Sequence, residues 1–319
     1  MATKEKLLLL LEANSGEFLS GEQIAHMLGV SRTSVWKAVK ALQAQGYGIQ
    51  AVTNRGYCLS KDSDVLSPAA IEEALTDPMW RIHSLPSIDS TNAHVRQMAE
   101  DGIDEGYVII AGEQTAGRGR MGRRFFSPAD TGLYMSLLLR PRQFSPDQAL
   151  QLTTMAASAL CLALEQVTGL KPGIKWVNDI FLNGKKICGI LTEAGFNLEI
   201  ARLDYVVLGM GLNLYPPREG FPRNLQSIAG YLFEDPQSEL TNRICVAFLN
   251  RFGDFYRNQK FMEAARIYRE RSIVIGRQVL VGKTQAQVLD ITDRCQLLVR
   301  LPDGNTKALS YGEVEIVNL

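Results

Sequence analysis

The residues with the clearest chemical character lie between Gly112 and Phe126, in the stretch GEQTAGRGRMGRRFF. Four arginines fall within seven residues of this stretch, and glycines rather than lysines or glutamates separate them. Glycine lets the backbone adopt φ > 0 and approach a ligand closely. The planar guanidinium group is always charged and suits phosphate and carboxylate groups. The stretch therefore predicts a loop that closes over an anion.

The apolar run Tyr107–Ala111 precedes this loop and predicts a buried strand. The loop would then leave the end of a sheet, where ligands bind in α/β folds. The alternative is a solvated basic turn, which the glycine spacing disfavours. The nucleotide motif GxxxxGK[ST] is absent, and GRGRMG matches GxGxxG by letter only, because no helix pattern follows it.

Other polar groups fall near predicted strand ends. Ser90-Thr91-Asn92 is a set of small donors and acceptors, for which helix N-capping is the alternative explanation. The stretch 175–179 (KWVND) could equally be a turn after a buried tryptophan, and Lys185-Lys186 could be a solvated strand end. Glycines recur near a polar strand terminus in Gly209–Asn213.

No arrangement of Ser, His and Asp or of Cys and His nominates a nucleophile of the protein's own. The candidate residues are cations and amides around a flexible anion loop. This set suits the positioning and neutralisation of a phosphoryl or acyl-phosphate group.

The chain has 319 residues, a length that predicts two or three domains. Its composition, 46% apolar and 21% charged residues, is typical of globular proteins, and its net charge is zero. Any nucleic-acid site must therefore be local. The five cysteines form no CxxC pair and their number is odd, which favours reduced thiols in the cytoplasm. Three histidines without paired spacing predict no transition-metal site. The apolar run Leu7–Leu11 is too short to span a membrane.

The first 60 residues predict a unit of their own. Helices are expected over Thr3–Ala13, over Gly21–Leu28 and from an N-cap at Ser31 to about Ala44, with Gly46 ending the last one. Val35, Ala38, Val39 and Leu42 form the buried stripe of that third helix. Strands over Tyr47–Val52 and Tyr57–Ser60 follow around a turn. Three helices and a hairpin in this order predict a winged helix-turn-helix.

The charge pattern of this unit supports DNA binding. Between Gln23 and Lys61 there is no Asp or Glu, while five basic residues are present. We expect Arg32 and Thr33 to reach base edges, and Lys37, Lys40 and Arg55 to hold phosphates. The alternative is a three-helix module for protein contacts. Trp36 is interpreted as a core residue.

A polar linker, Lys61–Pro68, precedes a region that alternates strands and helices to about residue 270. Several strands follow one another without a helix between them, so a mixed sheet is expected rather than a parallel one. The expected strands are Arg81–Leu85, Tyr107–Ala111, Leu133–Leu139, Ile174–Val177, Ile187–Thr192 and Tyr205–Leu212, and the main helices are Pro146–Val167, Asn242–Gln259 and Met262–Glu270. From Ile275 onwards, short strands and the turn Pro302–Asn305 predict a small β-barrel of the SH3 kind.

The motifs IDSTN, EQTAGRGRMGR, KWVNDI and KKICGIL, in this order and at these spacings, resemble those of biotin protein ligases. The resemblance extends over nearly the whole chain, and the terminal modules are similar to those of the bifunctional form that also represses the biotin operon. Two departures are Val177 in place of the usual proline and Met121 in place of a frequent basic residue. The resemblance implies an α+β multidomain protein: a winged helix-turn-helix (1–62), a mixed α/β ligase domain like class II synthetases (67–271) and an SH3-like domain (272–319).

The resemblance also implies two half-reactions. ATP and biotin give biotinyl-5′-AMP, and a lysine of a biotin carboxyl carrier protein then attacks this mixed anhydride. Lys186, Arg120 and Asp179 are implied as catalytic residues. Biotin is implied to contact Ser90, Thr91, Asn92, Gln114, Arg118, Gly119, Arg120, Lys186, Gly189 and Gly209. ATP or the adenylate is implied to contact Gly117, Arg118, Arg120, Arg123, Asn178, Lys186 and Asn213. Magnesium is expected to arrive with ATP, held mainly by phosphates.

The implied partners are the carrier protein of acetyl-CoA carboxylase, operator DNA and, with the adenylate bound as corepressor, a second copy of the chain, and no membrane is implied. Two alternatives stay open. One is a repressor that senses a small molecule without catalysis, against which Lys186 and the complete arginine loop argue. The other is a lipoate ligase, against which the sequence GRGRMGR argues.

Overall fold

The computed structural model describes residues 3–44, 47–60, 64–141, 144, 149–197 and 202–317. Gly46, the first residues of the predicted linker and residues 145–148 at the start of the predicted helix Pro146–Val167 lie outside this range. The chain divides into two compact units, Met1–Ala74 with Asp235–Arg243 and Leu75–Glu234 with Ile244–Leu319. Each unit is described by itself.

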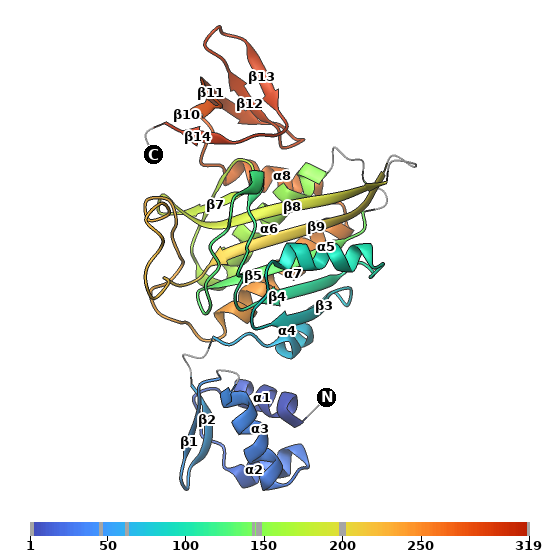
Figure 1. The fold of residues 1–319 in the computed structure, drawn as a ribbon, viewed down its shortest axis with the longest axis vertical. Coiled ribbons are helices and arrows are strands. Elements are labelled where there is room, and N and C mark those ends of the chain that lie inside the picture. The colour runs from blue at the N-terminus through green and yellow to red at the C-terminus, as the bar shows by residue number, and fades with distance from the viewer. Residues whose placement is uncertain are drawn as a thin grey trace. The chain divides into compact units, whose positions relative to one another are not determined.

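The first unit is a winged helix-turn-helix followed by a short helix (Figure 1). The Ser31 hydroxyl accepts from the amide of Ser34 at 3.1 Å, so the predicted N-cap of the third helix is confirmed. Gly29 ends the second helix in the left-handed conformation. The elements are α1 (Thr3–Ala13), α2 (Gly21–Leu28), α3 (Arg32–Ala44), the antiparallel hairpin β1 (Ile49–Val52) and β2 (Gly56–Leu59), and α4 (Pro68–Ala74).

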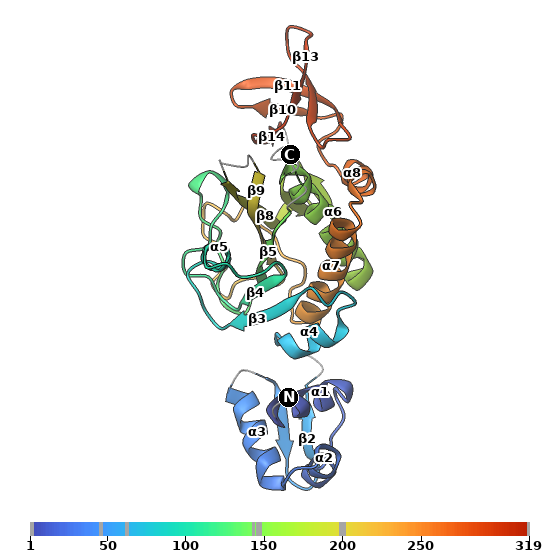
Figure 2. The same cartoon turned by 90° about the vertical axis from the view of Figure 1, so that its right-hand side faces the viewer.

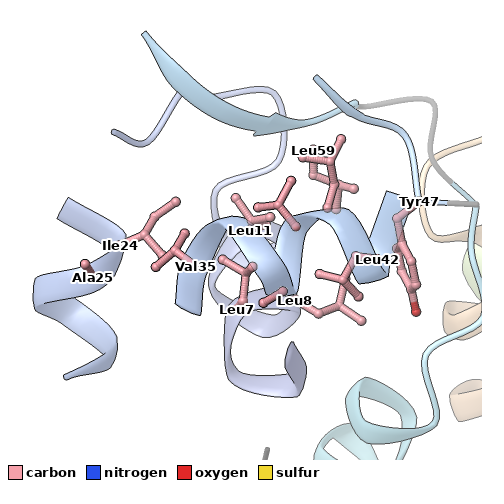
Figure 3. Packing of buried hydrophobic residues seen from close by; sticks show 12 residues of the cluster. Leu7, Leu8, Leu11, Ile24, Ala25, Val35, Leu42, Tyr47 and Leu59 are labelled. Carbon is pink, nitrogen blue, oxygen red and sulfur yellow. The ribbon is translucent and has the colours of Figure 1, made fainter. Parts of the chain in front are cut away.

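Leucines of α1 pack against the apolar stripe of α3 to form the core of this unit. Figure 3 shows Leu7, Leu8 and Leu11 beside Val35 and Leu42, and all five are at most 6% exposed. The predicted stripe of the third helix is therefore confirmed. The interpretation of Trp36 as a core residue is wrong, because this side chain is 51% exposed.

The second unit contains a seven-stranded sheet in the order β3-β4-β5-β9-β8-β7-β6. Only β3 and β4 run parallel, so the predicted mixed sheet is confirmed. The strands are β3 (Arg81–Leu85), β4 (Tyr107–Ala111), β5 (Gly132–Leu139), β6 (Gly173–Lys175), β7 (Asp179–Leu182), β8 (Lys185–Asn197) and β9 (Arg202–Asn213).

Helices cover both faces of this sheet. Figure 2 shows α5 (Thr91–Glu100) on one face and α6 (Ala149–Thr168) and α7 (Leu240–Arg257) on the other, with α8 (Phe261–Glu270) against α6. The segment KWVND differs from the prediction. The expected strand Ile174–Val177 stops at Lys175, and Lys175 pairs with Asp179 across a tight turn into β7. Both Asn178 and Asp179 therefore lie in a hairpin at the end of the sheet.

The C-terminal residues form one antiparallel sheet in the order β13-β12-β11-β10-β14. Its end strands β13 and β14 are not paired with each other within the described range, so the expected small β-domain is present as an open sheet. Trp176 joins it to the seven-stranded sheet, because its indole Nε1 donates to the Cys295 carbonyl at 3.0 Å. Its strands are β10 (Gln278–Val281), β11 (Thr284–Ile291), β12 (Leu297–Arg300), β13 (Thr306–Leu309) and β14 (Val314–Ile316).

All five cysteines are buried and have free thiols. In the described ranges, no helix combines the length and the apolar character needed to cross a bilayer. The same ranges contain no group of three His, Cys, Asp or Glu residues that could hold a metal ion.

Candidate active site and nucleic-acid surface

A pocket of about 580 Å³ lies in the second unit, where the arginine loop meets the ends of the sheet strands. It brings together segments that are far apart in the sequence: the start of α5, the loop 112–131, the β6–β7 hairpin and the start of β8. Fourteen of the predicted ligand-binding and catalytic residues line this pocket: Ser90, Thr91, Asn92, Gln114, Arg118, Gly119, Arg120, Arg123, Asn178, Asp179, Lys186, Gly189, Gly209 and Asn213.

Gly117 is the predicted site residue that does not line the pocket. A Cβ at this position would lie 2.5 Å from the Phe125 carbonyl oxygen and 2.8 Å from the Ser127 hydroxyl. The Phe125 amide also donates to the Gly117 carbonyl at 2.9 Å. The loop therefore folds back on itself, and glycine is required here by that close approach rather than by a ligand.

A lysine and a carboxylate that line the pocket face each other. Lys186 Nζ lies 2.6 Å from Asp179 Oδ1, and the two side chains are 28% and 22% exposed. They come from neighbouring strands, since β7 and β8 are joined by a tight turn. Half-burial weakens solvent screening of this pair, so the carboxylate holds the ammonium group in a fixed position. Lys175 lines the same pocket, and burial lowers its pKa.

Arg120 is the arginine of the loop that reaches inward. Its guanidinium donates to Asn178 Oδ1 and to the Gly312 carbonyl, both at 3.1 Å. Burial is the main influence on this group and lowers its pKa. Arg123 forms an ion pair with Glu313. The loop is thus connected to the turn before β14 of the C-terminal sheet, a contact that the sequence analysis did not anticipate.

The cluster at the start of α5 is a hydrogen-bond network. The Thr91 amide and hydroxyl donate to Gln114 Oε1 at 2.9 and 3.0 Å. Ser136 Oγ lies 2.7 Å from Thr91 Oγ1 and 2.6 Å from Asn92 Oδ1. Asn92 Nδ2 also donates to Glu193 Oε2 at 2.7 Å. The side chains of Thr91 and Asn92 are therefore engaged with the protein, and both fix the shape of the pocket.

Ser90 caps a helix and can also donate a hydrogen bond to a ligand. Its hydroxyl caps α5 by accepting from the Ala93 amide, so the N-capping explanation is confirmed. Its hydroxyl hydrogen remains available for a ligand in the pocket, because a serine can donate and accept at once.

Gly189 of β8 and Gly209 and Gly211 of β9 line the pocket and form part of its floor. A Cβ at Gly209 would lie 1.8 Å from Asn92 Oδ1, and one at Gly211 would lie 2.4 Å from the Phe125 ring. Any side chain at these positions would displace the Asn92 network or the aromatic ring above the floor.

Sequence reasoning missed three groups at this site. Phe125 and Phe126 line the pocket, and their place directly after the arginines was a signal. Ser136 is fully buried, and a lone serine within the apolar run LYMSLLL was another signal. Glu193, 101 residues from its partner Asn92, had none.

The segment between β9 and α7 forms a wall of the pocket. Lys185 Nζ donates to the carbonyls of Gln226 and Ser227 at 3.1 and 2.7 Å. Asn213 Nδ2 donates to the Gly230 carbonyl at 2.9 Å. The segment 224–229 is thereby held against the start of β8, and it lines the pocket with Leu225, Ile228 and Ala229.

The first unit carries the predicted DNA-binding residues on its surface. Arg32 and Thr33 line a groove of about 620 Å³ between α3 and the β1–β2 wing. Lys37 and Lys40 are exposed on the same helix. The guanidinium carbon of Arg55 lies 4.2 Å from the centre of the Phe18 ring, which holds this wing residue in place.

Comparison with known proteins decides the family. Residues 84–213 match the Biotin/lipoate A/B protein ligase family, and residues 3–58 match an HTH domain. The chain is 33% identical to the bifunctional ligase/repressor BirA of Bacillus spizizenii, over 96% of this chain and 97% of that protein. The chain belongs to the family of bifunctional biotin protein ligase/repressors.

Two further likenesses agree with this family. The BirA of Escherichia coli is 34% identical over 66% of this chain and 63% of its own length. The biotin protein ligase of Aquifex aeolicus, solved in complex with biotin and ATP, covers 74% of this chain and 98% of its own, with a TM-score of 0.61 and 24% identity. That likeness concerns the fold. The predicted family, its enzyme class and the helix-turn-helix are therefore confirmed.

Proposed function

We propose that the pocket of the second unit activates biotin with ATP and transfers it to a lysine of a biotin carboxyl carrier protein. The observation that carries this proposal is the meeting of Lys186, the arginine loop and the hydrogen-bond network of Thr91 and Gln114 around one cavity. The hydrogen-bond network offers a site for the neutral, polar head group of biotin. The lysine and the arginines beside it offer a site for two anions, the carboxylate of biotin and the α-phosphate of ATP.

In the first half-reaction, a carboxylate oxygen of biotin attacks the α-phosphorus of ATP and pyrophosphate leaves. Two anionic groups must come within bonding distance. Lys186, fixed by Asp179, offsets their repulsion and stabilises the charge that grows in the transition state. Arg118 and Arg120 are assigned to the carboxylate and the phosphate, where a bidentate guanidinium fits.

In the second half-reaction, the neutral amine of the carrier lysine attacks the acyl carbon of biotinyl-5′-AMP. An amide forms, AMP leaves and the amine loses a proton. Asp179 is the carboxylate nearest to Lys186, so it is placed to orient the incoming amine or to accept this proton. The amide of Asn178 is assigned to the nucleotide.

Biotin is assigned to the network end of the pocket, where Ser90 and Gln114 keep free hydrogens for its polar head group. The glycine floor gives its rings room. Magnesium would arrive with ATP, held mainly by phosphate oxygens, and Asp179 and Glu315 are pocket carboxylates that could share it.

We further propose that biotinyl-5′-AMP is the corepressor and that the winged helix binds operator DNA as part of a homodimer. Support for the dimer comes from β8, where Thr192–Phe196 pairs with β9 on one side and with no strand on the other in the described ranges. Phe196 on this edge is 45% exposed. A free strand edge is a template for a second chain.

The test is pyrophosphate exchange into ATP with biotin, lipoate or octanoate as the acid. We expect exchange with biotin alone. Exchange with lipoate would instead identify a lipoate ligase. Biotin binding without exchange would identify a sensor that performs no catalysis.

A further inference from the structure

Trp36 is a feature of the first unit that neither its core nor the ligase reaction explains. It is 51% exposed, whereas Trp80 and Trp176 are 4% and 2% exposed. It lies on α3 one turn after Arg32 and Thr33, so the three side chains share a helix face. The buried stripe of α3 lies on the other face.

Trp36 also lines the groove between α3 and the wing, which Val52, Thr53 and Asn54 border from β1 and the turn. Val52 is 40% exposed, so two apolar side chains face solvent across this groove. The start of α2 contributes Glu22, which is the acidic residue among those that line the groove. From residue 23 to residue 61 the sequence contains no other acid.

The chemistry of this surface favours duplex DNA as the occupant. Arg32 in the groove and the exposed Lys37 and Lys40 on the same helix complement phosphates, and α3 has the position of a recognition helix. In the major groove, base edges present hydrogen-bonding atoms and one apolar group, the thymine 5-methyl. An exposed indole beside Arg32 and Thr33 can contact that methyl group while its neighbours reach polar edges.

We propose that Trp36 is a specificity-determining residue that packs against the 5-methyl group of a thymine in each half-site. This inference rests on the proposed DNA-binding function. The contact differs from those of Lys37 and Lys40, because it buries apolar area and neutralises no phosphate.

The test uses the full-length chain with a non-hydrolysable biotinyl-adenylate analogue and a randomised duplex library. Each thymine of the selected duplex is then replaced by deoxyuridine, which removes only the methyl group. Burying one such group contributes roughly fourfold in affinity. We expect each half-site to contain one thymine whose replacement, made singly, weakens wild-type binding by about that factor. In Trp36→Ala the same replacement should have no effect.

Two controls separate this contact from a general loss of binding. Trp36→Phe keeps an aromatic ring and should retain the sensitivity to deoxyuridine. The slope of log affinity against log salt should stay unchanged in Trp36→Ala and fall by about 2 in Lys40→Ala, which removes one phosphate contact from each protomer of the dimer.

Equal sensitivity to deoxyuridine in the wild type and in Trp36→Ala would overturn the proposal while leaving DNA binding intact. A shallower salt slope in Trp36→Ala would also overturn it. A wild-type chain that enriches no duplex would refute the repressor function, and the role of Trp36 with it.

Discussion

At the scale of single residues, Lys186 is the side chain on which adenylation depends. Lys186→Ala removes the cation between two approaching anions, and we expect a loss of about 10²–10³ in the rate of pyrophosphate exchange. The fold should persist, because both side chains of the pair are partly exposed, at 28% and 22%, and water can solvate Asp179 once Lys186 is removed. Lys171→Ala is the matched control, since Lys171 is 71% exposed and pairs with Glu165 outside the pocket. Equal exchange rates in the two variants would mean that another cation, such as Lys175, has this role.

Arg120 has a different role at the same scale, because it connects the loop to its surroundings. Arg120→Gly removes the hydrogen bonds to Asn178 and Gly312. We expect adenylate formation to continue at a reduced rate, because Lys186 and Arg118 remain, and the reactive intermediate to escape, because the loop excludes water and retains the adenylate. Release is measured as free biotinyl-5′-AMP and as biotin on lysines of a bystander protein. Met121→Gly is the control, because this side chain belongs to the same loop, is 79% exposed and is not among the residues that line the pocket. If Arg120→Gly releases no more adenylate than the wild type, the loop does not retain the intermediate.

At the scale of elements, the wall 224–229 depends on Lys185. Lys185→Met keeps the apolar stem and removes the donors to Gln226 and Ser227. A buried hydrogen bond from a charged donor contributes about 1.5–3 kcal/mol, but both bonds of Lys185 are exposed to solvent and contribute less, so loosening this wall should raise the KM for ATP about tenfold. The affinity for biotin, measured by calorimetry, should be unchanged, because biotin is assigned to the opposite end. Lys185→Arg should restore the KM. A kcat that falls while the KM for ATP stays constant would contradict this role.

The same scale shows what the sequence could and could not predict. The sequence analysis placed β3 and β4 to the residue, β4 from its continuous apolar run, and it placed the three N-terminal helices, the third from its N-cap at Ser31. The strand β7 was missed because four residues after a turn carry little pattern. Helical spacing alone could not decide whether Trp36 faces the core or solvent, because it lies beside the buried stripe of α3. Pairings such as Arg123 with Glu313 depend on how distant segments pack, and nothing local in either segment encodes them.

At the scale of the whole molecule, the chain must combine catalysis with DNA binding. Deleting residues 1–62 should abolish binding to the selected duplex and leave the pocket residues in place, since none of them comes from this segment. Gel-shift and pyrophosphate-exchange assays on the same truncated protein measure the two activities separately. Retention of DNA binding would refute the assignment of the winged helix. Loss of exchange would mean that the first unit supports the ligase domain.

One chain carries one recognition helix, and a few basic contacts bind DNA weakly at physiological salt. Helix-turn-helix repressors gain specificity as dimers on two half-sites. We therefore expect biotinyl-5′-AMP to promote dimerisation, because an anion bound under the arginine loop lowers the entropic cost of ordering that segment. The carrier protein would use the same face of the domain, so carrier and second protomer would compete. Abundant unmodified carrier would consume the adenylate and lift repression.

Sedimentation of the protein alone, with biotin and with a non-hydrolysable adenylate analogue measures this coupling. We expect the dimer to be favoured about tenfold or more by the analogue, a coupling within the usual range of about 1–3 kcal/mol. Phe196→Asp places a charge on the free edge of β8 and should abolish the dimer while leaving pyrophosphate exchange intact. A dimerisation constant that is equal in all three ligand states would refute the switch, even if ligation and DNA binding were both established. A Phe196→Asp variant that dimerises normally would place the interface elsewhere on the domain.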